Sequence, residues 1–183
     1  MEVWASTAAL MMQSRRWEVR MGGANGAIKM IERAEGAAAR DRLGEKLGDE
    51  VTLVSLSRDE EYRVRLLAGQ LASLAPNHPS LLSQTLKQLS DTFNSTCELS
   101  TSIKDPLEAR RRLADLERYL ETDLQLIKGL LVASLDQAAI VQLIDVLHKY
   151  IRGEASSGHV QNKHIREAAQ VVVQSVMEKE VGE

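Results

Sequence analysis

Two apolar stripes at helical spacing, separated by a short turn, constrain the fold of this chain more than any other feature. The first stripe alternates spacings of four and three residues, through Leu82, Leu86, Leu89 and Phe93. The second follows a strong helix start, Asp105-Pro106-Leu107-Glu108, in which a capping acid precedes a proline at the first helical position. Its members are Leu113, Leu116, Leu120, Leu124, Ile127 and Leu131. Because such stripes pack long helices together, we expect residues 79–131 to form an antiparallel αα-hairpin, with Leu86, Leu89, Leu116 and Leu120 buried inside it.

The composition extends the helical prediction to the whole chain, which has the length of one ordinary domain. Only 3% of the 183 residues are aromatic and three are proline, while strong helix formers recur throughout. We therefore expect an all-α fold, an irregular bundle of about six to seven helices around the central hairpin, with more than about 65% of the residues helical.

Glycines and capping patterns set the other expected helix boundaries. A first helix over residues 3–21 ends at Gly22-Gly23, which we interpret as a hinge, and a second runs over residues 25–43 with Gly36 inside it. Residues 51–56 alternate as in a strand. Because a lone strand has no partner for its backbone groups, we interpret them as an extended lead into a helix, or as an edge that pairs with another chain. A capping box at residues 57–60 begins the helix that follows, and this helix extends to Leu74.

Two more helices complete the expected set beyond the hairpin. A capping box at residues 134–137 starts a helix that ends at Gly153, the expected C-terminal glycine. The last helix carries an apolar face through Ile165, Ala169, Val172 and Val176.

Interface-forming residues concentrate at the beginning of the chain. Both tryptophans and four of the six methionines lie in residues 1–21. Such large flat or flexible side chains are common at protein interfaces. We therefore expect an N-terminal helical arm over residues 1–21, distinct from a bundle domain over residues 24–183. Its predicted partner-binding residues are Trp4, Met11, Met12, Trp17 and Met21. The alternatives are a first helix that docks in its own core, or one that lies on a membrane surface.

The charge does not favour nucleic acid as the partner. The chain carries 23 basic and 26 acidic side chains, for a net charge of −3. Two arginine clusters keep nucleic acid as an alternative, and their members are Arg15, Arg16, Arg20, Arg110, Arg111 and Arg112. Acidic residues flank the second cluster, as is typical of a solvated helix face.

Patterns of catalysis or metal binding do not occur in the sequence. Cys97 is single, which excludes an intramolecular disulfide. Asp145 and His148 lie three apart, which is at most half of a metal site. The glycines of residues 22–26 lack the preceding strand and the Gly-Lys-Ser/Thr ending of a phosphate-binding loop. We therefore expect no catalytic residue, no cofactor and no metal.

The leading interpretation is a non-enzymatic structural, assembly or protein-interaction protein. It would act as an oligomer or as a component of a larger assembly such as a shell, a filament or a secretion apparatus. The second is a nucleic-acid-associated regulator or packaging protein that uses the arginine clusters. The third is a helical enzyme with a site across the bundle, which requires buried titratable groups facing one another in a pocket. No signal peptide or apolar stretch of about 18 residues is recognisable, so we expect no transmembrane segment and a location in the cytoplasm or in an intracellularly assembled particle.

Overall fold

A computed structural model describes residues 2–75, 78–130, 141, 144, 145, 147 and 163–181, and the statements below refer to these residues. They form eight helices and no strand, which confirms the predicted all-α class with more helices than expected. The helices are α1 (Glu2–Met12), α2 (Trp17–Glu32), α3 (Ala37–Leu47), α4 (Glu50–Ser57), α5 (Tyr62–Ala72), α6 (Pro79–Ser102), α7 (Pro106–Leu130) and α9 (Lys163–Val181). Most of the helix predicted from residue 134 onward, with Leu131 and His148, lies outside the described residues.

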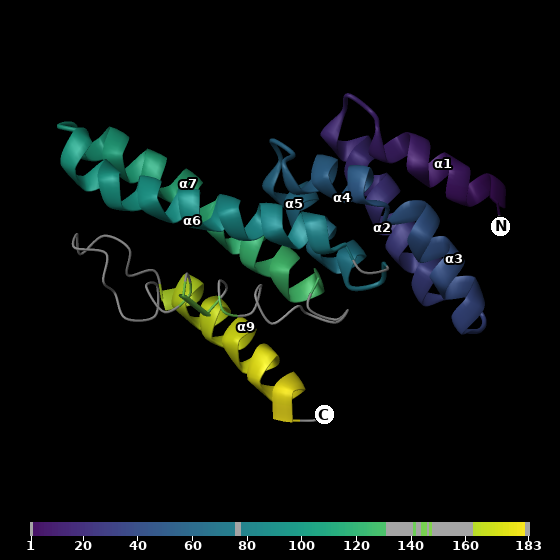
Figure 1. Cartoon of the computed structure of the whole chain (residues 1–183). Coiled ribbons are helices and arrows are strands. Elements are labelled where there is room, and N and C mark those ends of the chain that lie inside the picture. The colour runs from purple at the N-terminus through teal and green to yellow at the C-terminus, as the bar shows by residue number, and fades with distance from the viewer. Residues whose placement is uncertain are drawn as a thin grey trace.

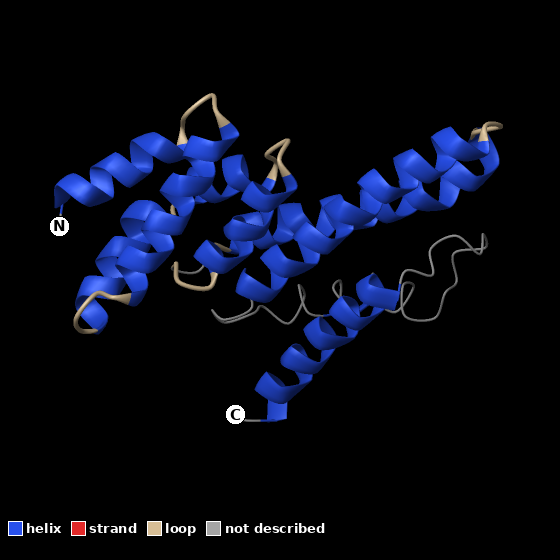
Figure 2. Ribbon diagram, turned by 180° about the vertical axis from the view of Figure 1, so that it is seen from behind, coloured by secondary structure: helices blue, strands red, loops and turns tan. Residues whose placement is uncertain are grey.

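The predicted hairpin is present as α6 and α7, which run antiparallel and extend away from α1 to α5 (Figure 1). The capping acid acts as expected, since the Asp105 carboxylate accepts a hydrogen bond from the backbone N–H of Leu107 at 2.9 Å. Helices α1 to α5 gather at the end of the hairpin opposite its turn, and the view from behind shows the same arrangement (Figure 2). Helix α9 packs against α7.

The core of the hairpin occupies only the half nearest the other helices. Every residue of the α6 stripe is buried, as are Leu120, Leu124 and Ile127 on α7. The prediction for Leu116 is wrong, because this side chain is half-exposed, and no residue of α7 before Leu120 is buried. Toward the turn, α6 and α7 extend beyond α5, so α5 does not cover this part of α7 (Figure 1).

The first predicted helix is two helices, and the predicted hinge is wrong. Helix α1 ends at Met12, and α2 continues without interruption through Gly22 and Gly23. The glycines allow α1 and α2 to cross at a short distance. A β-carbon added at Gly23 would lie 2.8 Å from both the β-carbon of Met11 and the backbone nitrogen of Met12. Glycine is therefore needed here for packing rather than for flexibility.

The next boundaries also differ from the predictions. Gly36 has φ +86° in the turn between α2 and α3, so the predicted helix over residues 25–43 is divided there. The predicted extended segment is α4, whose N-terminus is capped by the Asp49 carboxylate accepting from the N–H of Thr52 at 3.0 Å. Ser57 ends α4 instead of capping the next helix, and Glu61 caps α5, which ends at Ala72.

Candidate interaction surface

The five predicted partner-binding residues lie in three different environments. Trp4 is 72% exposed on α1, whereas Met12 is 3% exposed and belongs to the core of its own chain. Met11, Trp17 and Met21 are half-buried. Trp4 is therefore the one member of this set that presents most of its side chain to the exterior.

Trp17 and Met21 belong to the packing of α2 on its neighbours. Both side chains pack against the hydrophobic core. The guanidinium of Arg63, on α5, lies over the Trp17 ring at 4.3 Å from its centroid. Such a cation–π contact is stabilising, and it covers one face of the ring within the same chain.

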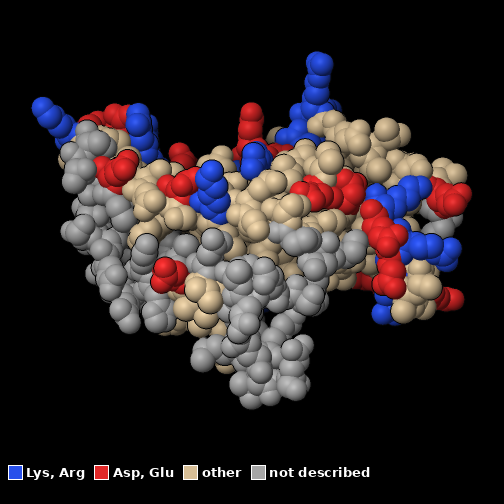
Figure 3. Space-filling model, in the orientation of Figure 1, with Lys and Arg blue, Asp and Glu red and all other residues tan. Residues whose placement is uncertain are grey.

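Helix α1 is apolar on both of its sides. Its inner side is formed by Ala5, Ala8 and Met12, all buried. We define its outer face as Val3, Trp4, Thr7 and Leu10, since Met11 lies against Gly22 and Gly23 of α2. Val3, Trp4 and Leu10 are 76%, 72% and 70% exposed. In the space-filling view the surface over α1 is mostly uncharged (Figure 3).

The polar group at the centre of this outer face is satisfied within the helix. The Thr7 hydroxyl donates a hydrogen bond to the carbonyl oxygen of Val3 at 2.8 Å. The face can therefore be covered by an apolar partner without leaving a buried donor unpaired.

Arg20, a predicted nucleic-acid contact, instead makes its hydrogen bonds and its ion pair within the protein. Its guanidinium makes a two-pronged ion pair with Asp59, through Nε to Oδ2 and through Nη2 to Oδ1, the latter at 2.8 Å. Its Nη1 donates to the carbonyl oxygens of Ser14 and Arg15, both at 2.8 Å. Arg20 thus joins the turn after α1 to the turn between α4 and α5.

The ion pair shifts the pKa of both partners. The hydrogen bond to Asp59 raises the pKa of Arg20. Burial favours the neutral form of Asp59, but the hydrogen bonds that its carboxylate accepts from Arg20 and from the N–H of Glu61 hold its pKa below the usual 3.8.

The other predicted arginines are exposed but lie beside acidic groups or at the far end of the molecule. Arg15 and Arg16 follow α1, and Arg16 lies 3.8 Å from Glu18. Residues 110–112 lie near the hairpin turn, where Arg112 pairs with Glu108 at 2.7 Å. Basic and acidic side chains alternate over the face shown in Figure 3, without a large patch of one sign.

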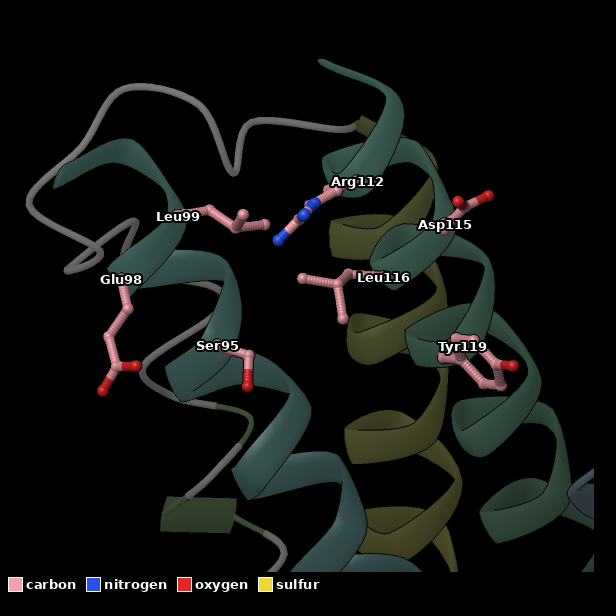
Figure 4. A pocket seen from close by; sticks show the side chains of 7 residues that line it. All are labelled: Ser95, Glu98, Leu99, Arg112, Asp115, Leu116 and Tyr119. Carbon is pink, nitrogen blue, oxygen red and sulfur yellow. The ribbon is translucent and has the colours of Figure 1, made fainter. Parts of the chain in front are cut away.

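Shallow hollows border α6 and α7, and two of them share residues. One, of about 390 Å³, is bordered by Ser95, Glu98, Leu99, Arg112, Asp115, Leu116 and Tyr119. Leu99, Arg112 and Leu116 point toward one another across the space between α6 and α7 (Figure 4). The second, of about 640 Å³, shares Ser95 and Leu116 with the first and reaches Arg58. Leu116 borders both hollows, which agrees with its half-exposed side chain.

Two ionisable side chains are buried where α5 meets α7. Arg65 is 3% exposed and Asp123 is 2% exposed. Arg65 lies over the Tyr119 ring at 4.1 Å, and its Nη1 donates to the carbonyl oxygen of Asp59 at 2.7 Å. Neither Arg65 Nε nor Asp123 Oδ2 has a hydrogen-bond partner.

Burial raises the pKa of Asp123 to about 7, against the attraction of the Arg65 and Arg58 guanidinium groups. Close by on α5, burial and a hydrogen bond to Glu121 raise the pKa of Tyr62 to about 12. The carboxyl of Asp123 can therefore change its charge near neutral pH. Neither Asp123 nor Arg65 lines the two hollows between α6 and α7. A helical enzyme remains a prediction.

The described residues contain no group of three or more His, Cys, Asp and Glu side chains that could hold a metal ion. His78 contacts the carbonyl oxygen of Gly48 through Nε2 at 2.8 Å. Within the same residues, no helix is long and apolar enough to span a membrane.

Comparison with protein-family models, with curated proteins and with solved structures finds no match to this chain. Its function must therefore be inferred from its own surfaces.

Proposed function

We propose that this protein is a non-enzymatic protein-interaction protein that works within an assembly, and that a protein partner covers the outer face of α1. The exposure of Val3, Trp4 and Leu10 carries this proposal. A surface helix normally has one apolar side, whereas a helix that is apolar all round is normally buried all round. Helix α1 is covered on its inner side only.

The types of residue on the outer face of α1 favour an interface over a chance occurrence of exposed apolar residues. Single exposed apolar residues are common on soluble proteins. Here three of them share one side of a three-turn helix. Tryptophan is among the residues that contribute most to the free energy of protein binding.

A protein partner is favoured over a membrane or a nucleic acid. Interfacial membrane helices carry a Lys- and Arg-rich polar side, whereas Glu2 is the sole charged residue of α1. Nucleic-acid binding uses arginines that reach phosphates, but Arg20 is held by Asp59 and Arg112 by Glu108.

Hydroxyl-radical footprinting tests the proposal. Trp4 should oxidise more slowly in the cells that make the protein than in a dilute purified sample, because a partner covers it there. Trp17 is the internal reference, since its own chain half-buries it in both samples. An equal ratio of Trp4 to Trp17 oxidation in the two samples would refute the proposed function.

A further inference from the structure

We propose that Asp123 and Arg65 form a proton-controlled contact between α7 and α5. When the carboxyl of Asp123 loses its proton to water, it accepts a hydrogen bond from the Nε–H of Arg65, and the two side chains become an ion pair. The contact lies where α5 packs on α7, at the junction between the hairpin and helices α1 to α5 (Figure 1). It is independent of the interaction proposed for α1, because both residues lie in the interior.

Each of the two side chains has one buried polar atom without a hydrogen-bond partner. These atoms are Nε of Arg65 and Oδ2 of Asp123, and the two residues are 3% and 2% exposed. Buried polar atoms are nearly always hydrogen-bonded, so two exceptions on facing helices require an explanation. One atom belongs to a donor, and the other is an oxygen that accepts when the carboxyl is ionised, so each can supply what the other lacks.

The protonation of Asp123 decides whether the ion pair can form. A guanidinium carries donors only, so Arg65 cannot accept the hydrogen of a neutral carboxyl. An ionised carboxylate accepts through both oxygens, and hydrogen bonds to charged groups are roughly twice as strong as those between neutral groups. In the structure the turn between α4 and α5 holds Arg65, whose Nη1 donates to the carbonyl oxygens of Asp59 and Glu60 at 2.7 and 3.1 Å. This arrangement, without an ion pair, is the one expected for neutral Asp123.

The backbones of α5 and α7 are in close contact beside these two residues. Gly69 follows Arg65 by four residues on α5, and Leu126 follows Asp123 by three on α7. A β-carbon added at Gly69 would lie 3.1 Å from the backbone nitrogen of Leu126. Because the helices are held together there, the change between the two states is confined to the side chains.

Two basic side chains act on the carboxyl of Asp123 through their charge. Arg65 comes from α5 and Arg58 from the residue directly after α4, and both favour the ionised form. Among the described residues, no side chain of α6 or α9 adds to their effect. Burial opposes them and raises the pKa of Asp123 to about 7. Desolvation and pairing nearly cancel in a buried ion pair, which also brings the two states close in free energy.

Nuclear magnetic resonance of the full chain as a function of pH follows both groups directly. The carboxyl carbon of Asp123 reports its ionisation, and the Nε–H of Arg65 reports the hydrogen bond. The two signals should shift together, with a common midpoint near pH 7. The Nε–H proton should move downfield as the shorter, charge-assisted hydrogen bond forms. This measurement uses the unaltered protein, so it does not depend on the folding of any variant.

Three substitutions test which residues make the contact. Asp123→Asn keeps the shape of the side chain but cannot ionise, so the Nε–H signal of Arg65 should become independent of pH. Asp115→Asn is the matched control, because Asp115 is an exposed carboxyl on the same helix, and the shift of Arg65 should persist in this variant. Arg65→Gln should move the midpoint of Asp123 to higher pH, since an attraction that favours the carboxylate is lost.

Three results would overturn the inference. In the first, the carboxyl carbon of Asp123 does not titrate within about two pH units of neutrality. In the second, it titrates while the Nε–H of Arg65 stays unchanged. In the third, the Nε–H of Arg58 shifts instead, which would assign the ion pair to the end of α4. The protection of Trp4 in cells tests the proposed function separately, since Trp4 belongs to α1.

Discussion

Gly129 of α7 faces the carbonyl oxygen of Gly69 of α5 so closely that a β-carbon added at Gly129 would lie 2.1 Å from that oxygen. A β-carbon added at Gly69 would in turn lie 2.7 Å from the carbonyl oxygen of Gln125. Both obstacles are backbone atoms, which cannot rotate aside as a side chain can. The crossing of α5 and α7 therefore depends on a glycine from each helix.

Gly129→Ala should destabilise the fold by about 1 to 3 kcal/mol or more, because the two helices must separate to admit the methyl group. Gly26→Ala is the matched control. Gly26 lies inside α2, and a β-carbon there meets nothing within 4 Å, so the change should stabilise by roughly 0.5 to 1 kcal/mol through helix propensity. Urea unfolding measures both values, and equal effects would refute the close crossing.

Asp59→Ala should cost about 3 to 5 kcal/mol, since it leaves the guanidinium of Arg20 without its counter-ion. The pair is well covered, with side-chain exposures of 17% for Arg20 and 3% for Asp59. The exposed pair of Arg16 and Glu18 provides the control, because Glu18→Ala should change stability by less than about 0.5 kcal/mol. Thermal melting of both variants in low and high salt compares them, and equal losses would contradict a structural role for Arg20.

Local sequence was sufficient to predict the hairpin, because the apolar stripes and the Asp105 cap act within a few residues along the chain. The same reasoning failed at Gly22 and Gly23. Two adjacent glycines have the same sequence pattern whether they form a flexible hinge or allow another helix to pack closely. Here they allow α1 to pack closely on α2. Capping choices were similarly ambiguous, since Ser57 suits a cap but ends α4, and Glu61 is the residue that caps α5.

The buried charges could not be predicted because their partners are distant in sequence. Arg20 and Asp59 lie 39 residues apart. One signal was present and missed: Arg65 and Asp123 occupy positions of α5 and α7 whose neighbours along the same face are apolar. The outer face of α1 was also only partly predicted, because the count of Trp and Met omitted Val3 and Leu10.

Asp123→Asn should remove a pH dependence of stability between about pH 4 and 7. The folded state holds the proton of Asp123 more tightly than the unfolded chain does, because burial raises the pKa from 3.8 to about 7. Asp123 therefore makes its full contribution to the free energy of unfolding below about pH 4, and this contribution is lost as the pH rises to about 7. At pH 8 the variant should be more stable than the wild type by up to about 4 kcal/mol.

Asp115→Asn is the control for this change, since Asp115 is an exposed carboxyl on the same helix. Denaturant unfolding at several pH values supplies the comparison. If the wild type lost no more stability than Asp123→Asn between pH 4 and 8, the buried carboxyl would have to be charged and paired.

Leu120→Ala should cost about 2 to 5 kcal/mol, and Leu116→Ala clearly less, although the two residues belong to the same stripe. Leu120 is fully buried between α7 and its neighbours, whereas Leu116 borders the hollows of the hairpin and is already half-exposed. Unfolding free energies of the two variants test how far the core reaches along α7. Equal losses would mean that the hairpin is covered beyond Tyr119.

The substitutions Met12→Ala and Leu10→Ala should have different effects on stability, because Met12 lies on the inner side of α1 and Leu10 on its outer face. Met12 is 3% exposed, so its truncation should destabilise the dilute protein by about 2 to 5 kcal/mol. Leu10 is 70% exposed, so its truncation should leave the dilute protein within about 0.5 kcal/mol of the wild type and weaken only its association. Deleting α1 cannot make this distinction, because the deletion also uncovers Gly23 and removes Met12 from the core. If Leu10→Ala lowered the melting temperature in dilute solution as much as Met12→Ala, the chain itself would already cover the outer face, and no partner would be needed there.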